Sequence, residues 1–182
     1  MRVIAGSARG RPLRCLDDRR IRPTQDRVKE AVFSSLAPRL PGSIVLDLFA
    51  GSGALGIEAL SRGAQGAVFV EIDRQACVLI KGNLAACGWP ASPDIQVVHR
   101  EAMRWLKGRT GGGYDIIFAD PPYNKGFEDS LLNVLSGGEL LRAGGILVLE
   151  SAARQELPEN RGVLYLSKSK VYGDTKISYY MI

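Results

Sequence analysis

Asp47-Leu48-Phe49-Ala50-Gly51-Ser52-Gly53 decides the fold, because this stretch joins a short apolar strand to a helix through a loop that contains glycine. The strand is predicted at 44–48 and the helix at 55–61. Glycines in such a loop let the backbone adopt left-handed dihedrals and come close to a ligand. Open α/β sheets bind ligands at the carboxyl ends of their strands, so this loop is predicted to lie at a binding site.

Strands and helices alternate along the chain after this loop. Alternation of this kind predicts right-handed crossovers and a parallel sheet. Nearly continuous apolar strands suit a sheet that is covered on both faces. After the first helix we expect, in order, strand 67–71, helix 74–86, strand 94–99, helix 101–106, strand 114–119, helix 127–135 and strand 145–150.

The end of the chain breaks this alternation. Segments 162–167 and 176–182 are both rich in β-forming residues, and Tyr172-Gly173-Asp174 between them has turn chemistry. No room remains for a helix, so the two segments are predicted to form an antiparallel hairpin at the sheet edge. A mostly parallel sheet with such a hairpin resembles the Rossmann-like α/β fold of class I S-adenosylmethionine-dependent methyltransferases.

The beginning of the chain is predicted to be a small basic extension, residues 1–22, ahead of a catalytic domain, residues 23–182. The extension reads as a short strand at Val3-Ile4 followed by loops, and Thr24 is a plausible N-cap for a leading helix over 24–36. Residues 1–39 hold ten Lys and Arg against four acids, whereas the whole chain carries +5. A basic segment on a nearly neutral body indicates a polyanionic partner, although a solvated surface without one has the same composition.

Length and composition exclude several classes of protein. The 182 residues fit one domain, and no apolar run is long enough to span a bilayer. The N-terminus lacks the apolar stretch of a signal peptide, so we expect a cytoplasmic protein, and a monomer. Three cysteines without a CxxC pair, together with one histidine, predict neither a disulfide framework nor a metal site.

Gly51, Gly53 and Gly56 also match the dinucleotide pattern GxGxxG, and Glu71 follows at the end of the next strand. An acid there would accept ribose hydroxyls in a dehydrogenase and in a methyltransferase alike. Two features favour S-adenosylmethionine over NAD. Leu48-Phe49-Ala50 widens the loop, and the Asp47 carboxylate would repel a pyrophosphate but tolerates a zwitterionic tail.

Glu101-Ala102 follows the third strand of the alternating pattern. The Glu101 carboxylate could accept a hydrogen bond from an adenine amino group. An acid at the start of a helix, favoured there by the helix dipole, is an equally good interpretation of the same residue.

Asp120-Pro121-Pro122-Tyr123 ends the fourth strand, at the same sheet edge as the glycine loop. The lone pair of an exocyclic base amine is delocalised into its ring, which makes the amine a poor nucleophile. If Asp120 and a backbone carbonyl near Pro121 accept the amine hydrogens, the nitrogen can pyramidalise and attack a methyl group in line. Tyr123 offers a stacking face for an extruded base, and Asp120 can take the released proton.

The whole chain resembles the RsmD family of bacterial methyltransferases of small-subunit ribosomal RNA. The resemblance begins with Arg2-Val3-Ile4-Ala5-Gly6, the Arg9-Gly10-Arg11 segment and Arg22-Pro23-Thr24, and it continues through the 46–56 loop, Asp120–Tyr123 and a late Tyr172-Gly173 turn. The N-terminal and Arg-Pro-Thr segments are far more specific than the glycine loop.

The resemblance implies that S-adenosylmethionine is the donor and that the acceptor is the exocyclic N2 of one guanine in 16S ribosomal RNA. The partner is then ribosomal RNA, the small subunit or its assembly intermediate. Related enzymes often have Asp-Ala where this chain has Glu101-Ala102, with its longer acidic side chain. Thr24 stands where related amino-methyltransferases touch the methionine tail. The predicted cofactor residues are Thr24, Asp47, Ala50, Gly51, Gly53, Glu71, Ile72, Glu101 and Ala102, and the predicted catalytic residues are Asp120, Pro121, Pro122 and Tyr123. The predicted RNA-binding residues are Arg2, Arg9, Arg11, Arg14, Arg22 and Arg27.

Two other functions fit part of the pattern. An amino-methyltransferase of DNA adenine or cytosine uses the same tetrapeptide, but this chain is short for a separate sequence-reading domain. The second alternative is a binding protein with a basic arm and an inactive site. Such a protein would not need an intact Asp-Pro-Pro-Tyr.

Overall fold

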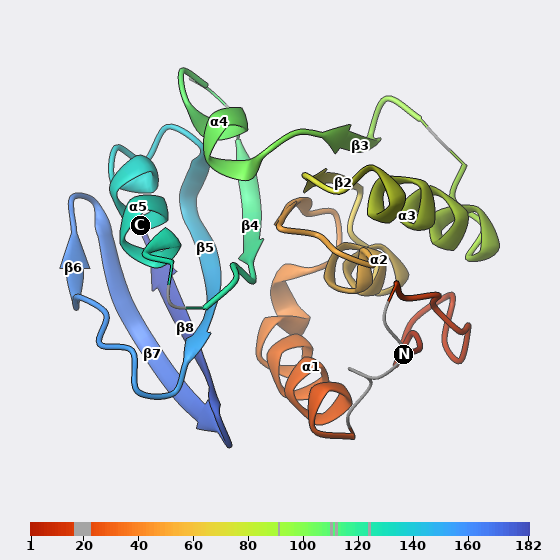
Figure 1. Cartoon of the computed structure of the whole chain (residues 1–182), viewed down its shortest axis with the longest axis horizontal. Coiled ribbons are helices and arrows are strands. Elements are labelled where there is room, and N and C mark those ends of the chain that lie inside the picture. Colours follow the sequence, from red (N-terminus) through yellow and green to blue (C-terminus); the bar gives the residue numbers. More distant parts are fainter. Residues whose placement is uncertain (17–22, 91, 110, 112, 124) are drawn as a thin grey trace.

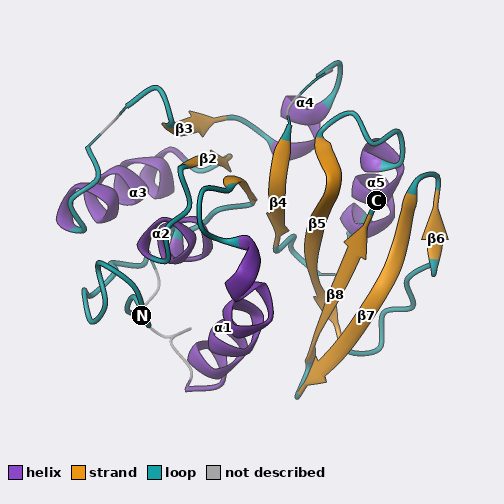
Figure 2. Cartoon of the chain, turned by 180° about the vertical axis from the view of Figure 1, so that it is seen from behind, coloured by secondary structure: helices purple, strands orange, loops and turns teal. Residues whose placement is uncertain are grey.

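A computed structural model describes residues 1–16, 23–90, 92–109, 111, 113–123 and 125–182. These residues fold into one eight-stranded sheet with helices on both faces (Figures 1 and 2). The helices are α1 (Pro23–Leu36), the 3₁₀ turn η2 (Ala37–Arg39), α2 (Ala54–Ser61), α3 (Arg74–Ala86), α4 (Ala102–Leu106) and α5 (Phe127–Leu135). The strands are β1 (Ile44–Leu48), β2 (Gly66–Glu71), β3 (Ile95–His99), β4 (Tyr114–Ala119), β5 (Leu141–Ala152), β6 (Asn160–Arg161), β7 (Leu164–Tyr172) and β8 (Thr175–Met181).

The strand order is β3-β2-β1-β4-β5-β8-β7-β6. Strands β3 to β5 run parallel, and β8 pairs antiparallel with both β5 and β7. The chain leaves β1 towards β2 on one side and later returns to β4 on the other. Such a reversal opens a crevice at the carboxyl ends of the two central strands. The parallel sheet and its antiparallel C-terminal hairpin confirm the predicted class I methyltransferase fold.

Two apolar layers hold the sheet between the helices. Alternate strand residues such as Val45 and Phe118 pack with α1, α2 and α3, whereas their neighbours Leu46 and Ile117 pack with α4 and α5. Each of these four side chains is fully buried. A sheet covered on both faces explains why β1 and β4 read as continuous apolar runs rather than as alternating ones.

Most predicted element boundaries agree with the structure to within a residue or two. Strand β5 is longer than the predicted 145–150, because residues from Leu141 onward already pair with β4 beside Tyr114. The short strand β6 was not predicted at all. Two residues carry no periodicity of their own, and β6 exists only because β7 offers it an antiparallel partner.

The N-terminal segment differs from its prediction. Val3-Ile4 does not form a strand, because the pairing there is limited to one isolated bridge between Arg2 and Pro12. The Val3 N–H donates to the Arg11 carbonyl at 2.9 Å, whereas the N–H groups of Ile4 and Ala5 donate to the Glu58 carboxylate of α2, at 2.8 Å and 3.0 Å. This satisfies amides that a strand would have satisfied through a ladder. The predicted division of the chain at residue 22 falls outside the described residues and stays a prediction.

Helix α1 begins at Pro23, one residue earlier than predicted. Thr24 therefore lies in the first turn of the helix rather than before it, so its prediction as the N-cap is wrong. Proline suits the first helical position, because its φ is already helical and its missing N–H would have no partner there. The side chain of Thr24 lies outside the description, and its contact with a cofactor stays a prediction.

Candidate active site

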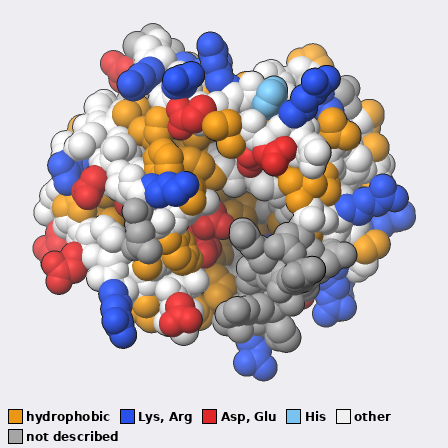
Figure 3. Space-filling model, viewed as in Figure 1, with side chains coloured by type: hydrophobic (Ala, Val, Ile, Leu, Met, Phe, Trp, Pro, Cys, Tyr) orange, Lys and Arg blue, Asp and Glu red, His pale blue; other side chains and the backbone are white. Residues whose placement is uncertain are grey.

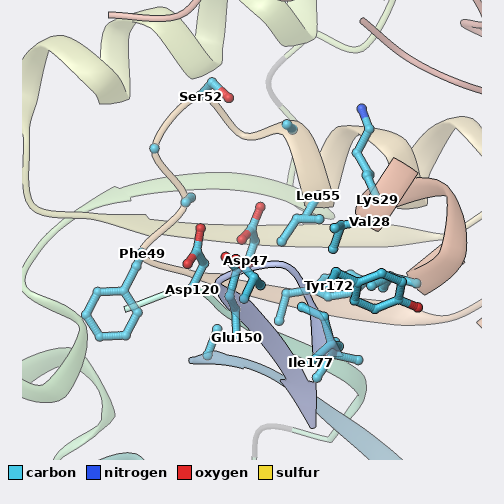
Figure 4. A pocket seen from close by; sticks show the side chains of 18 of the residues that line it. Val28, Lys29, Asp47, Phe49, Ser52, Leu55, Asp120, Glu150, Tyr172 and Ile177 are labelled. Carbon is cyan, nitrogen blue, oxygen red and sulfur yellow. The ribbon is translucent and has the colours of Figure 1, made fainter. Parts of the chain in front are cut away.

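A cavity of about 550 Å³ opens at the carboxyl ends of β1, β4 and β5. Its floor is formed by residues of these strands, and α1 and the tip of the β7–β8 hairpin form its sides (Figure 4). A hollow near the centre of the face in Figure 3 is bordered by apolar and acidic side chains. The cavity has the size of a small-molecule site and combines an apolar wall with a few polar groups.

The glycine loop forms one edge of the cavity and is held from two strands. Asp47 Oδ2 accepts a hydrogen bond from the Gly56 N–H at 2.9 Å, and Glu71 Oε2 accepts one from the Gly51 N–H at 2.7 Å. The other Glu71 oxygen accepts from the Asp73 N–H at 2.8 Å. Two carboxylates at neighbouring strand ends thus fix the path of the loop.

Three loop residues adopt the left-handed conformation, with φ of 59° at Phe49, 54° at Gly51 and 76° at Gly53. Glycine adopts it freely, whereas a residue with a side chain is strained there by about 1–3 kcal/mol. The Phe49 ring packs against Phe127 with 5.4 Å between ring centroids. This contact holds a strained residue at the edge of the cavity.

Asp47 is a buried carboxyl with no basic side chain paired to it among the described residues. Only 2% of its surface is exposed. Burial raises the pKa of Asp47 to about 7, and the negative charge of Glu71 adds to this rise, whereas the bond from the Gly56 amide opposes it. The charge of Asp47 is therefore poorly compensated, and a cation bound in the cavity would stabilise it.

Asp120 follows the last residue of β4 and faces the cavity beside Asp47 and Glu150 (Figure 4). Water reaches the side chain through the cavity, but protein surrounds it on the remaining sides. This limited solvation raises the pKa of Asp120, and repulsion from Glu150 and Asp47 raises it further. The cavity therefore concentrates negative charge at one point.

Tyr123 is oriented by residues of β5 and β8. Its hydroxyl donates to Glu150 Oε1 at 2.7 Å and lies 3.1 Å from Thr175 Oγ1. Desolvation and the hydrogen bond to Glu150 raise the pKa of Tyr123, so the phenol stays protonated and keeps donating. The hairpin thus fixes the ring that follows the two prolines.

The structure brings Asp47, Ala50, Gly51, Asp120 and Tyr123 together in the cavity wall, as the sequence predicted. The remaining predicted cofactor residues whose side chains are described lie outside that wall. These are Gly53, Glu71, Ile72, Glu101 and Ala102.

Glu101 caps α4, since its carboxylate accepts from the Met103 N–H at 2.9 Å and the Arg104 N–H at 2.7 Å. This is the helix-start interpretation of the residue, and its contact with adenine stays a prediction. Ile72 exposes 63% of its surface, which is unusual for a large apolar side chain just after a strand. An exposed apolar side chain beside Glu71 is suited to cover one face of a flat ring.

Sequence reasoning missed several side chains of the cavity, among them Lys29, Glu150, Tyr172 and Thr175. Glu150 could have been found, because it stands near the end of a predicted strand of the same parallel sheet. Tyr172 and Thr175 reach the cavity only because the hairpin folds back along β5. Lys29 reads as an ordinary helix residue, yet its ammonium donates to the Arg2 carbonyl at 2.6 Å.

The predicted RNA-binding arginines that are described are all exposed, namely Arg2, Arg9, Arg11, Arg14 and Arg27. Arg22 lies outside the described residues. The segment that carries four of them is held against α3 by the side chain of Asn83. The Asn83 amide oxygen accepts from the Arg14 N–H at 2.9 Å, and the amide nitrogen donates to the Arg14 carbonyl at 3.0 Å and to the Ser52 carbonyl in the glycine loop. Basic side chains are therefore presented from a fixed backbone next to the cavity.

Fold and cavity together define a class I methyltransferase: a parallel sheet with an antiparallel hairpin, a glycine loop after β1, and Asp-Pro-Pro-Tyr after β4 at the same edge. A family model described as "Conserved hypothetical protein 95" matches residues 1–181. The chain belongs to this family, which confirms the RsmD-family assignment made from its motifs.

Three similar proteins show how closely the family is matched. The chain is 39% identical to "Putative rRNA methyltransferase YlbH" of Bacillus subtilis, over 99% of this chain and 98% of that protein. It is 37% identical to "Ribosomal RNA small subunit methyltransferase D" of Escherichia coli, over 99% and 89%. The solved structure titled "Putative methyltransferase yhhF from Escherichia coli" superposes with a TM-score of 0.84 at 37% identity, over 99% and 96%.

Proposed function

We propose that this protein transfers a methyl group from S-adenosylmethionine to the exocyclic N2 of a guanine in small-subunit ribosomal RNA, as a cytoplasmic monomer. The observation that carries the proposal is the meeting of Asp120, Tyr123 and the glycine loop in one acidic cavity. Relatives that cover nearly the whole chain are named ribosomal RNA methyltransferases, which supports RNA as the acceptor.

The cavity fits a cationic donor. Asp47, Asp120 and Glu150 crowd together, and the pKa of each is raised. Lys29 is the one basic side chain among the described lining residues, and it is paired with Glu58 at 3.4 Å. S-adenosylmethionine, when bound, supplies an electrophilic methyl on a sulfonium that these carboxylates would stabilise. Asp47, Ala50 and Gly51 would hold its methionine part, and Glu71 and Ile72 its adenosine.

Asp120 and Tyr123 then act on the acceptor. Asp120 accepts a hydrogen of the amine and draws its lone pair out of the ring system, while the tyrosine ring supports the flat base. The raised pKa of Asp120 also suits it to take the proton that the amine loses. The prolines between them keep carboxylate and ring at a constant separation, since their φ angles are fixed.

The direct test is transfer of labelled methyl from S-adenosylmethionine to small-subunit RNA and to small subunits, followed by mass mapping of the modified nucleotide. We expect one N2-methylguanine. Absence of label in every RNA and subunit form would sink the proposal. A labelled product that survives ribonuclease but not deoxyribonuclease would assign the activity to DNA.

Cofactor affinity is expected to fall as the pH is lowered from 8 to 6. Asp47 has a pKa of about 7 in the free protein, so at pH 6 a proton must leave before the carboxylate can stabilise a cation. One such proton weakens binding by up to about tenfold per pH unit. Calorimetry in buffers of different ionisation heat measures both the affinity and the released proton.

The Asp47→Asn variant is the control for this pH dependence, since it should bind more weakly at pH 8 and change less between pH 8 and 6. Unfolding of the protein at low pH does not explain this expected loss of affinity. The pKa of Asp47 is raised on folding, so this group makes the native state more stable as the pH falls from 7 towards 4. An affinity that is flat across this range in the wild type would contradict the charge assigned to Asp47.

RNA affinity is expected to depend strongly on salt through the N-terminal arginines. If about six of them meet phosphates, the slope of log K against log salt is about −4 for single-stranded RNA. Replacing Arg9, Arg11 and Arg14 by glutamine should reduce the slope by about 2. Titrations at several salt concentrations measure this, with replacement of Arg104 on α4 as the matched control. An unchanged slope in the triple variant would remove the segment from the RNA interface.

A further inference from the structure

Glu150 lies close to Asp120 in the cavity. The register of β4 and β5 places Ala119 beside Leu149, so Asp120, which follows β4, lies close enough to Glu150 for the charge of Glu150 to raise the pKa of Asp120. The side chains of Asp120 and Glu150 share the face of the sheet on which Asp47 lies, and Figure 4 shows the three acids together. Two carboxylates therefore confront whatever base enters the cavity.

The position of Glu150 is fixed by its own partners. Oε1 accepts a hydrogen bond from the Tyr123 hydroxyl at 2.7 Å, and Thr175 Oγ1 lies 3.1 Å from the same hydroxyl. Within the described ranges no Lys or Arg forms an ion pair with Glu150, although the residue lines the cavity. Tyr123 and Thr175 therefore orient the carboxylate, and its remaining lone pairs can accept further hydrogen bonds.

The bases differ at the ring nitrogen beside the exocyclic amine. In guanine this nitrogen, N1, carries a hydrogen, so the amine and N1 form two adjacent donors. In adenine and cytosine the corresponding ring nitrogen carries a lone pair and accepts. A flipped base is read through these groups of its Watson–Crick edge. A pair of carboxylates matches two adjacent donors and repels a donor beside an acceptor.

We propose that Glu150 is the residue that selects guanine: it accepts the N1–H while Asp120 accepts a hydrogen of the neighbouring amine. The proposal rests on the proposed function, because it assigns a specificity role within that reaction. It gives a structural reason for guanine that Asp-Pro-Pro-Tyr lacks, since the tetrapeptide alone suits the amines of several bases.

The first test uses the wild-type enzyme and RNA that carries either guanine or 2-aminopurine at the mapped nucleotide. 2-Aminopurine keeps the 2-amine but has a lone pair at N1. We expect kcat/KM for 2-aminopurine to be lower by about 10- to 100-fold, the usual discrimination from one polar contact to a base edge. Equal use of the two bases would overturn the proposal without any variant.

The second test changes Glu150 to glutamine. The amide oxygen can still accept the Tyr123 hydroxyl, while the amide NH₂ can donate to an unprotonated N1. The preference for guanine over 2-aminopurine should therefore fall by about tenfold or more, and 2-aminopurine should improve relative to guanine. The matched control is Asp174→Asn, which removes another acid of the cavity wall, in the turn between β7 and β8, and should keep the preference.

The outcomes separate the two proposals. If no RNA is methylated by the wild type, the proposed function fails. If guanine is methylated but E150Q slows both bases equally, Glu150 only orients Tyr123 and the specificity role is refuted. Calorimetry of E150Q with S-adenosylmethionine shows whether the variant is folded and binds, so a folding failure is not mistaken for either result.

Discussion

Replacement of Asp120 by alanine is expected to reduce methyl transfer by about 100- to 10,000-fold, the range for loss of a positioned acid–base group. Alanine removes the acceptor that localises the lone pair of the amine and that takes its proton. Asp120 is one of five acids among the described lining residues of the cavity, and its loss leaves Asp47 and Glu71 in place as the acceptors that hold the glycine loop. Cofactor affinity should therefore change little, and single-turnover kinetics with calorimetry measures the two effects separately.

Asp115 at the other end of β4 provides the control for this experiment. It bonds the Ile44 N–H at 2.7 Å and pairs with Arg142 at 2.8 Å, away from the cavity. Asp115→Asn should keep the turnover. If Asp120→Ala instead lost cofactor affinity alone and kept its turnover at saturation, Asp120 would be a cofactor residue.

Replacement of Glu58 by alanine is expected to destabilise the fold by about 3–5 kcal/mol, the cost of leaving buried charges without their partner. Glu58 is completely buried in α2 and accepts from Arg62 Nε at 2.7 Å as well as from two N-terminal amides. It also pairs with Lys29, whose pKa is lowered by burial. Its loss leaves Lys29 and Arg62 without their carboxylate and two backbone donors without an acceptor. Urea denaturation measures the free energy of unfolding.

The exposed ion pair between Arg161 and Asp129, 3.3 Å apart, is the matched control. Water solvates both partners, so Asp129→Asn should cost less than about 1 kcal/mol. Glu58→Ala should in addition release the first residues to proteolysis, because Ile4 and Ala5 lose their acceptors. A change below about 1 kcal/mol for Glu58→Ala would show that the cluster is not a structural centre.

The order of the elements could be predicted from local patterns. Each strand from β1 to β5 is an apolar run between turn residues, and α3 and α5 begin and end at the predicted residues. Asp120 and Gly51 could be assigned to one site, because all parallel strands end at the same sheet edge. Glu58, by contrast, reads as one acid on a short helix, and of its four partners only Arg62 is near it in the chain.

The sequence by itself determined the alternation of strands and helices, the class I fold, and the placement of Asp47, Gly51, Asp120 and Tyr123 at one edge. These follow from periodicity and from turn residues, which act within a few positions along the chain. Only the tertiary structure decided that Glu150 lies beside Asp120 and bonds Tyr123, that the hairpin closes the cavity, and that the N-terminal amides end on Glu58. Strand register and burial of charge depend on groups far apart in sequence, so their energies appear only when the sheet has formed.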